Sequence, residues 1–210
     1  MARIIALDTP NRTALWRVTS DDATPTDAGQ PDLTVSDSAP AQSFPARLAG
    51  LGPLRGDAGY LPALARLLTL GAVAENPNWD GIVLVILSPH AHWTHVSAGE
   101  AISALATVTP TLVQALGADG LLDQPAMEEI MSRPERLTSA LAADPDHALS
   151  HLVGADLAAA RRWWLGHQLR LVGDGALADA FADALMTQGA PVARTDIATA
   201  TRCGLMALAT

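Results

Sequence analysis

Six consecutive apolar residues run from Ile82 to Leu87 and end at the turn-forming pair Ser88-Pro89. An unbroken apolar run bounded by turn formers predicts a strand that is buried on both faces of a sheet. A second strand is expected at His92–Val96, so Gly81–Val96 should form a β-hairpin at the centre of the fold. In an α/β protein, such a turn is a place where a ligand-binding loop is presented.

The N-terminal part shows the spacing of short strands followed by one helix. Apolar residues predict a strand at Arg3–Asp8 and its hairpin partner at Thr13–Thr19. The Asp-, Pro- and Ser-rich stretch Ser20–Ser43 predicts a loop with at most a short edge strand at Leu33–Val35. Apolar positions three and four residues apart then predict a helix over Tyr60–Val73.

The middle of the chain is expected to be mainly helical. We predict a helix over Ser97–Leu116 that is interrupted at Pro110, and short helices over 125–142. Asp144-Pro145-Asp146 is typical of a helix start and predicts one long amphipathic helix over His147–Gly166.

The C-terminal part reads as a strand–turn–helix–strand–helix unit. Its elements are expected at Gln168–Val172, Gly173–Gly175, Ala176–Gln188, Pro191–Arg194 and Ile197–Leu208. Right-handed parallel connections are the rule for such units. The chain is therefore predicted to have an α/β fold, with a hairpin-like N-terminal part and a doubly wound C-terminal part.

The amino-acid composition limits which kinds of binding partner the protein is expected to have. The 210 residues carry a net charge of −9 and contain no lysine, because all 13 basic residues are arginine. An acidic chain argues against nucleic-acid and anionic-membrane partners. The single cysteine, Cys203, excludes a disulfide framework, and no apolar run reaches the roughly 18 residues of a membrane helix. The apolar patch at the N-terminus is too short for a signal peptide, so a cytoplasmic protein is expected.

Two groups of residues suggest site chemistry by themselves. His90, His92 and His95 crowd the central hairpin and suggest a metal site, with a solvated histidine cluster as the alternative. Gly173-Asp174-Gly175 follows a strand and opens a helix, which is a geometry that binds phosphate or ribose. This turn lacks the full dinucleotide fingerprint.

Two carboxylates and an aromatic segment are further candidates. Asp8 ends the first strand and could position a metal–phosphate group. Asp57 could act as a general base or could simply cap the following helix. Arg161-Arg162-Trp163-Trp164 suggests a stacking platform, but core aromatics beside a solvated arginine pair fit an acidic protein better.

Short motifs along the chain are similar to those of one enzyme family. Leu152-Val153-Gly154-Ala155-Asp156 with Arg161 resembles a Leu-Ile-Gly-Ala-Glu helix, and Leu171-Val172-Gly173 resembles an adenosine-binding strand and loop. Ala200 and Gly204 resemble a closing Ala-Gly-Ile helix. Arg55-Gly56-Asp57, Pro89–Val96 and Thr107–Leu112 resemble, in turn, an Arg-Gly-Glu motif, a phosphate hairpin and a Thr-Gly-Glu-Leu segment. In this order the motifs resemble the 2-dehydro-3-deoxygalactonokinase family of the actin-like, hexokinase-like ATPases, over roughly residues 1–19 and 50–210.

The resemblance implies a fold and a reaction. The fold would be the α/β, actin-like ATPase (ribonuclease H-like) fold, with a strongly reduced N-terminal lobe over 1–75 and a complete C-terminal lobe over 76–210. The reaction would be the ATP- and Mg²⁺-dependent phosphorylation of a 2-keto-3-deoxy sugar acid. The resemblance makes Asp57 the catalytic base and Asp8 the metal ligand. It places the cofactor at Asp8, Thr13, Gly173, Asp174 and Gly175 and the sugar acid at Arg55 and His92. The protein could assemble as a homodimer, and the sequence leaves this open.

Several positions depart from the family pattern. Pro10 stands where Asp-x-Gly-x-Thr has glycine, His90-Ala91 replaces Gly-Thr, Thr94 replaces lysine, Pro110 and Thr111 replace Gly-Glu, and Asp174 brings negative charge to the adenosine loop. Phosphoryl transfer depends on positioning and charge neutralisation at the phosphates. A catalytically inactive paralogue that acts as a ligand sensor or partner subunit is therefore the alternative. A metal-dependent hydrolase that uses the histidines is a third reading.

Overall fold

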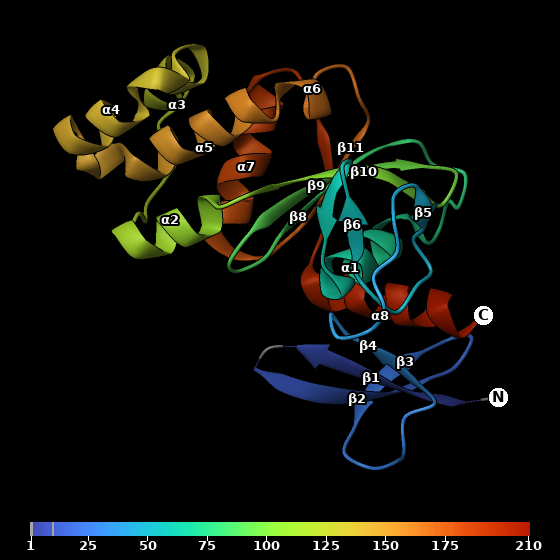
Figure 1. The fold of residues 1–210 in the computed structure, drawn as a ribbon. Coiled ribbons are helices and arrows are strands. Elements are labelled where there is room, and N and C mark those ends of the chain that lie inside the picture. Colours follow the sequence, from blue (N-terminus) through green and yellow to red (C-terminus); the bar gives the residue numbers. More distant parts are fainter. Residues whose placement is uncertain (1, 10) are drawn as a thin grey trace.

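The computed structural model describes residues 2–9 and 11–210, which form a four-stranded sheet, a six-stranded sheet, a two-stranded hairpin and the helices that pack between and around them (Figure 1). The smaller, N-terminal sheet has the strand order β3-β2-β1-β4. Its strands are β1 (Arg3–Thr9), β2 (Arg12–Val18), β3 (Ala23–Thr26) and β4 (Leu33–Val35). The predicted hairpin and the short strand at Leu33–Val35 are thus confirmed, and β4 pairs with β1 in parallel. The prediction that Ser20–Ser43 has no other strand is wrong, because β3 pairs with β2.

The larger sheet has six strands in the order β12-β11-β8-β9-β10-β5. Its strands are β5 (Ala46–Arg47), β8 (Gly81–Ile86), β9 (Ala91–Ser97), β10 (Glu100–Thr107), β11 (Leu169–Val172) and β12 (Val192–Thr195). Strands β8, β11 and β12 run parallel, as the C-terminal pattern predicts, whereas β9 and β10 are antiparallel to their neighbours. A separate hairpin of β6 (Leu54–Gly56) and β7 (Gly59–Leu61) lies beside β10.

Helices cover both faces of the larger sheet. They are α1 (Ala63–Val73), α2 (Thr109–Leu116), α3 (Gln124–Ser132), α4 (Leu137–Ala143), α5 (Ala148–Ala159), α6 (Arg161–Trp164), α7 (Gly175–Thr187) and α8 (Ile197–Ala209), with 3-10 turns at Pro134–Arg136 and Pro145–His147. Helices α5, α6 and α7 pack on one face, and α1 and α8 pack on the other.

The central strand β8 is buried at every residue. Ile82, Leu84 and Ile86 belong to the core under α5 and α7, whereas Val83 and Val85 belong to the core under α1 and α8. Successive side chains of a strand point to opposite faces, so an unbroken apolar run is what a sheet covered on both sides requires. The expectation for the central hairpin is confirmed.

Helices α1 and α8 also join the two sheets. Ala63 and Leu67 of α1 and Leu205 of α8 belong to the core of the N-terminal sheet, although other residues of both helices face the larger sheet. A Cβ atom added to Gly71 would overlap the carbonyl of Ala200, so the two helix backbones touch there. The first sheet thus uses the last helix of the chain, and the lobe boundary at residue 75 stays a prediction.

Two predicted helices are wrong. Ser97–Leu116 contains strand β10 before α2, because Ala98 and Gly99 both have positive φ and form a tight hairpin turn after β9. Pairing with β9 then overrides the helix propensity of this alanine-rich stretch. The predicted helix His147–Gly166 breaks at Ala160 into α5 and the short α6, whose Trp163 and Trp164 are buried in the core.

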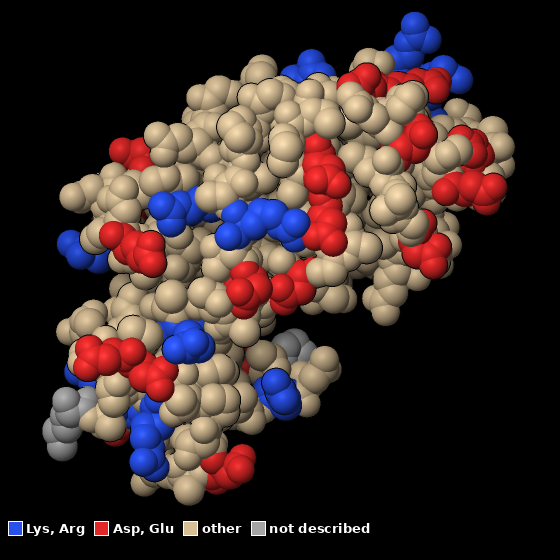
Figure 2. Space-filling model, turned by 180° about the vertical axis from the view of Figure 1, so that it is seen from behind, with Lys and Arg blue, Asp and Glu red and all other residues tan. Residues whose placement is uncertain are grey.

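Charge on the surface is spread in small groups. Figure 2 shows, on the face seen from behind, several acidic groups and arginines that lie near them instead of forming one continuous basic strip. Arg202 pairs with Asp22, and Arg194 pairs with Asp179. None of the described helices has the length and apolar character needed to cross a membrane.

Candidate functional site

The first predicted site residue, Asp8, lies near the end of β1. Thr13 donates its hydroxyl hydrogen bond to Oδ1 of Asp8 over 2.9 Å, and Ser36 donates to Oδ2 over 3.0 Å. The β1–β2 hairpin brings Thr13 to Asp8, and the parallel pairing of β4 with β1 brings Ser36, which follows β4. The structure therefore unites Asp8 and Thr13 as predicted, and adds Ser36.

The sequence pattern does not single out Ser36 as a site residue, because Ser36 is one of many polar residues in a predicted loop. The available signal was its place directly after the short strand at Leu33–Val35, since the ends of parallel strands meet at one edge of a sheet. Both carboxylate oxygens of Asp8 are held by hydroxyl donors, which fixes the orientation of the carboxylate and leaves further lone pairs free. Pro10, the residue at the family's glycine position, lies outside the described residues.

The turn of the central hairpin follows β8. Leu87 donates its backbone N–H to His90, and Thr111, the residue at the family's glutamate position, donates to the carbonyl of Pro89 over 2.7 Å. Thr111 therefore ties the start of α2 to this turn. At the family's lysine position, the hydroxyl of Thr94 is fully buried and has no hydrogen-bond partner among the described residues.

His92 is a buried neutral histidine. Its side chain is 2 % exposed, and its Nδ1 has no partner among the described residues. Burial and the neighbouring His90 lower the pKa of His92 to about 4. Because removal from water disfavours the charged form, His92 is neutral near pH 7 and is not a cation.

The Gly173–Gly175 turn lies beside the end of β8. A Cβ atom added to Gly173 would come within 3.2 Å of the Cβ atoms of both Ile86 and Ala178, so the close packing at this turn favours glycine there. Gly175 has φ +77° with open space around it, and Asp174 makes no side-chain cap to α7. Since β8 and β11 are parallel, this turn and the hairpin turn leave the same edge of the sheet.

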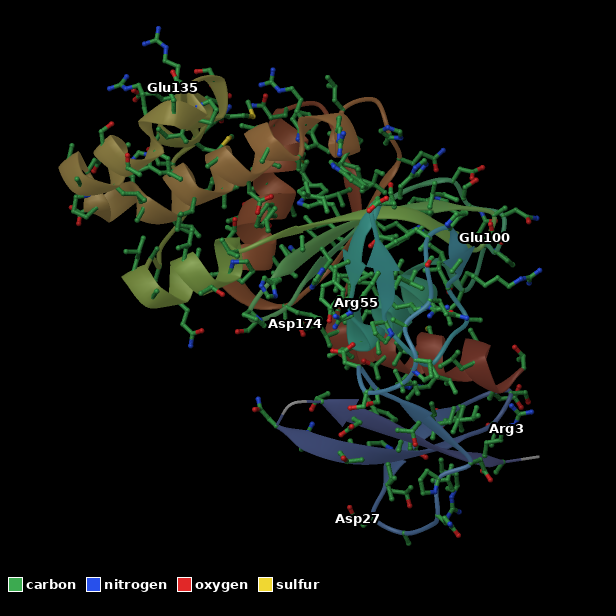
Figure 3. The ribbon with its side chains drawn as sticks, in the orientation of Figure 1. Arg3, Asp27, Arg55, Glu100, Glu135 and Asp174 are labelled. Carbon is green, nitrogen blue, oxygen red and sulfur yellow. The ribbon has the colours of Figure 1, made fainter. Side chains whose placement is uncertain are left out.

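Arg55 and Asp57 belong to the β6–β7 hairpin, not to a helix start. The alternative in which Asp57 caps a helix is therefore wrong, because α1 begins at Ala63. The guanidinium of Arg55 lies 4.7 Å from the centre of the Tyr60 ring. Figure 3 labels Arg55 at the β6–β7 hairpin and Asp174 at the turn before α7, on different elements.

Asp57 itself lines a groove at the other end of the larger sheet. The groove, of about 390 Å³, also contains Ile82, His95 and Ser103, which lie opposite one another on three neighbouring strands. Thr107, four residues beyond Ser103, is paired with Ala91 at the turn end of the sheet. At about 3.3 Å per residue, Ser103 and the turn end are separated by about 13 Å.

The three hairpin histidines do not form one cluster. His92 points to the face covered by α1, whereas His95, three residues later, points to the opposite face. His90 lies 5.9 Å from His92, and His95 lies 5.9 Å from His167, measured between ring centres. Within residues 2–9 and 11–210, no group of three or more His, Cys, Asp or Glu side chains has a metal-binding arrangement.

A buried carboxylate that was not singled out as a site residue lies under the hairpin. Asp156 of α5 accepts from the indole of Trp93 over 3.0 Å and from the hydroxyl of Thr107 over 2.5 Å. Burial raises the pKa of Asp156, although hydrogen bonds from Thr107, Thr109 and Trp93 oppose this shift. The available signal was a single acidic residue on the otherwise apolar Leu152–Leu157 stretch.

The comparisons with known proteins agree with the motif order. Residues 131–208 match the family described as 2-keto-3-deoxy-galactonokinase. The crystal structure of a "putative 2-dehydro-3-deoxygalactonokinase protein" from Sinorhizobium meliloti superposes with a TM-score of 0.78 at 15% identity, covering 99% of this chain and 98% of that chain. No curated protein matches.

Two further solved structures superpose less closely. They are component A of the (R)-2-hydroxyglutaryl-CoA dehydratase of Acidaminococcus fermentans (TM-score 0.47, 11% identity, 100% of this chain and 95% of that chain) and the ethanolamine utilization protein EutJ of Carboxydothermus hydrogenoformans (TM-score 0.47, 10% identity, 99% and 90%). The fold predicted from the sequence is confirmed. Residues 131–208 are thus similar to the 2-keto-3-deoxy-galactonokinase family, and the chain as a whole shares the fold of the Sinorhizobium meliloti protein.

Proposed function

We propose that this chain binds MgATP at the three turns around Asp8, Pro89 and Gly173, and that its reaction is phosphorylation of a 2-keto-3-deoxy sugar acid. The observation that carries the proposal is the carboxylate of Asp8, oriented by Thr13 and Ser36 at the end of the first strand. In a chain with the fold of the kinase family, this is the position at which an oxygen ligand for a divalent cation is expected.

The residues present fit a magnesium ion and a nucleotide. Mg²⁺ is commonly held by one or two carboxylates together with substrate phosphates, so Asp8 alone is a sufficient protein ligand. When bound, the ion would neutralise charge on the phosphates. Gly175 leaves the backbone at the start of α7 open to close approach, and Thr13 offers a hydroxyl. Asp174 suits a ribose hydroxyl better than a phosphate.

The proposed chemistry is an in-line transfer. The hydroxyl oxygen of the sugar acid forms a bond to the γ-phosphorus, while the bond from that phosphorus to the bridging oxygen breaks and ADP leaves. Asp57 would accept the hydroxyl proton. Arg55, held over the Tyr60 ring, would bind the substrate carboxylate, and neutral His92 would accept or donate one hydrogen bond.

One observation favours a second candidate, an inactive paralogue that senses ligands or assists an active partner. Asp57 lines a groove that it shares with Ser103, which is about 13 Å along the sheet from the turn end, and Thr94 and Ala91 take the places of the family's lysine and threonine. Proton transfer to Asp57 would require the base and the phosphates to be brought together by closure of the lobes. Binding without turnover is the outcome that this arrangement favours.

A coupled assay separates the two candidates. The full chain is incubated with MgATP and a synthetic 2-keto-3-deoxy sugar acid, and ADP release and phosphorylated product are both measured. The kinase proposal expects both products to form together and to be lost in Asp57→Asn. ADP formation that does not depend on the sugar acid, or turnover that Asp57→Asn leaves unchanged, would refute the assigned base. Nucleotide binding without product supports the second candidate.

A further inference from the structure

A buried arginine of α1 holds the loop that leads from the N-terminal sheet to the β6–β7 hairpin. Arg66 is 1 % exposed and forms no ion pair with any carboxylate that the structure describes. Its guanidinium donates four hydrogen bonds to oxygen atoms of residues 42–52. The acceptors are the side-chain amide of Gln42 (2.7 Å) and the backbone carbonyls of Arg47, Leu48 (3.1 Å) and Gly52 (2.8 Å).

The path of this loop depends on the guanidinium. Burial of a cation without a counter-charge is costly unless hydrogen bonds replace those it makes with water. A guanidinium offers five N–H donors in fixed directions, so it can hold several oxygen atoms at once, which the flexible ammonium of lysine cannot do in the same way. The fit is also tight, because a Cβ atom added to Gly50 would lie 2.0 Å from Nη2 of Arg66. Residues 42–52 therefore follow the surface of one side chain.

One part of the loop is connected to the carboxylate of Asp8. The backbone N–H of Ser36 donates to the carbonyl of Leu51 over 2.9 Å, and the Ser36 hydroxyl donates to Oδ2 of Asp8 over 3.0 Å. Leu51 directly precedes Gly52, whose carbonyl accepts from Arg66. Two successive carbonyls of the loop therefore hold Ser36 and the guanidinium, so displacement of the guanidinium would also displace the support of Asp8.

Another part of the loop is connected to Arg55. The backbone N–H of Arg55 donates to the carbonyl of Gln42 over 2.9 Å, and the N–H of Gln42 donates to the carbonyl of Pro53 over 3.0 Å. Gln42 also forms an isolated parallel bridge with Leu54 at the start of β6. Because the side chain of Gln42 accepts from Arg66, the same guanidinium fixes the residue on which strand β6 rests.

We infer that Arg66 is a positioning residue, which holds Ser36 against Asp8 and holds Arg55 in its strand by fixing the loop over 42–52. The inference rests on the proposed function, in which Asp8 binds the magnesium ion and Arg55 binds the sugar acid. Arg66 touches neither ligand and acts through two backbone hydrogen bonds, those of Ser36 and Arg55. Three of its four acceptors are backbone carbonyls, so no sequence motif marks this role.

Amide hydrogen exchange of the full chain without ligands measures the positioning itself. In Arg66→Lys, which keeps the charge but loses the fork of donors, protection of the Ser36 and Arg55 amides should fall about tenfold or more. The reference is the amide of Ile82, which donates to a carbonyl inside the larger sheet and makes no contact with the loop. A ratio of protection to Ile82 that stays at its wild-type value in Arg66→Lys would overturn the inference.

Two glycines provide a matched pair of variants that leave Arg66 in place. Gly50→Ala adds a Cβ atom at the guanidinium and should lower the protection of the Ser36 and Arg55 amides as Arg66→Lys does. Gly71→Ala adds the same atom at the contact of α1 with Ala200 and should leave the ratio to Ile82 unchanged, although it also destabilises the fold. Equal ratios in the two glycine variants would contradict a specific role of the guanidinium.

Titration with MgATP gives a readout that loss of stability alone does not move. Arg66→Lys and Ser36→Ala should each weaken MgATP binding about tenfold, and Gly71→Ala should bind as the wild type does. The double variant of Arg66 and Ser36 should bind no more weakly than the weaker single variant, because Arg66 acts through Ser36. Additive losses would overturn the inference. Absence of MgATP binding in the wild type would refute the proposed function, and the exchange ratios then decide separately whether Arg66 holds Ser36 and Arg55.

Discussion

Trp93 of β9 donates its indole N–H to Asp156 of α5 over 3.0 Å, in the buried core between the central hairpin and the helices that cover it. The same carboxylate accepts from Thr107 at the end of β10. Strand β9, strand β10 and helix α5 are therefore joined by one buried side chain. These two hydrogen bonds hold the turn end of the hairpin, which lies at the proposed nucleotide site.

Replacing Asp156 tests this bond. Asp156→Ala leaves the indole of Trp93 and the hydroxyl of Thr107 without a buried partner, so the free energy of unfolding should fall by about 1–3 kcal/mol or more. Asp156→Asn keeps an acceptor for Trp93 and should cost less. Urea denaturation at pH 7 measures both, with the exposed Asp183→Asn on α7 as control. An alanine variant as stable as the control would contradict the network.

The raised pKa of Asp156 also determines how the free energy of unfolding depends on pH. The folded protein binds this proton more tightly than the unfolded chain, so the contribution of Asp156 to stability falls as pH rises from the unfolded pKa of 3.8 to the higher folded pKa. The stability of the wild type relative to Asp156→Asn should therefore decline through that window. A difference that grows with rising pH would show the opposite shift.

His92 should make the protein sensitive to acid. Its folded pKa of about 4 lies below the unfolded value of 6.5, so the unfolded chain takes up the proton first and stability falls as pH drops from 6.5 to 4. At 1.36 kcal/mol per pKa unit, the loss amounts to at most about 3 kcal/mol. His92→Gln should flatten the acid side of a stability–pH curve measured by denaturant titration.

His147 serves as a control, because its pKa shift is opposite in direction to that of His92. Hydrogen bonding to Asp144 raises the pKa of His147, so the stability it contributes is present at low pH and is lost as pH rises through the folded pKa. His147→Gln should therefore make the acid-induced loss steeper. If both histidine variants shifted the curve in the same direction, the assignment of the acid sensitivity to His92 would be wrong.

The close contact between α1 and α8 predicts that adding one methyl group at Gly71 destabilises the protein. Gly71→Ala would raise helix propensity by about 1 kcal/mol at an open position. Here the new Cβ would overlap the carbonyl of Ala200, so one helix must shift and the variant should lose about 2 kcal/mol or more of unfolding free energy. Thermal denaturation checks this prediction, and a stabilised variant would refute the close packing.

The sequence predicts elements well where local pattern and tertiary role agree. The run Ile82–Leu87 indicates a buried strand because burial on both faces demands continuous apolar residues. The helix predicted across β10 fails because alanines carry no strand signal, and only the turn at Ala98-Gly99 marks the reversal. The order of short local motifs indicates the family whose model matches residues 131–208.

The candidate site was only partly predictable. Thr13 and Asp8 meet through a hairpin that the sequence reveals, whereas Ser36 reaches Asp8 through a parallel pairing over 28 residues. The opposite orientations of His92 and His95 follow from strand alternation once β9 is known to extend through both. The meeting of Asp57 with Arg162 and His167 depends on how the β6–β7 hairpin and α6 pack around one sheet, and no local pattern records it.

The central claim is that MgATP binds next to Asp8, and calorimetric titration of MgATP into the full chain tests it most directly. The account predicts saturable binding at one site in the wild type, weakened about tenfold or more in Asp8→Asn and unchanged in Asp183→Asn. The absence of saturable heat at millimolar MgATP, or equal affinity in Asp8→Asn and wild type, would contradict it.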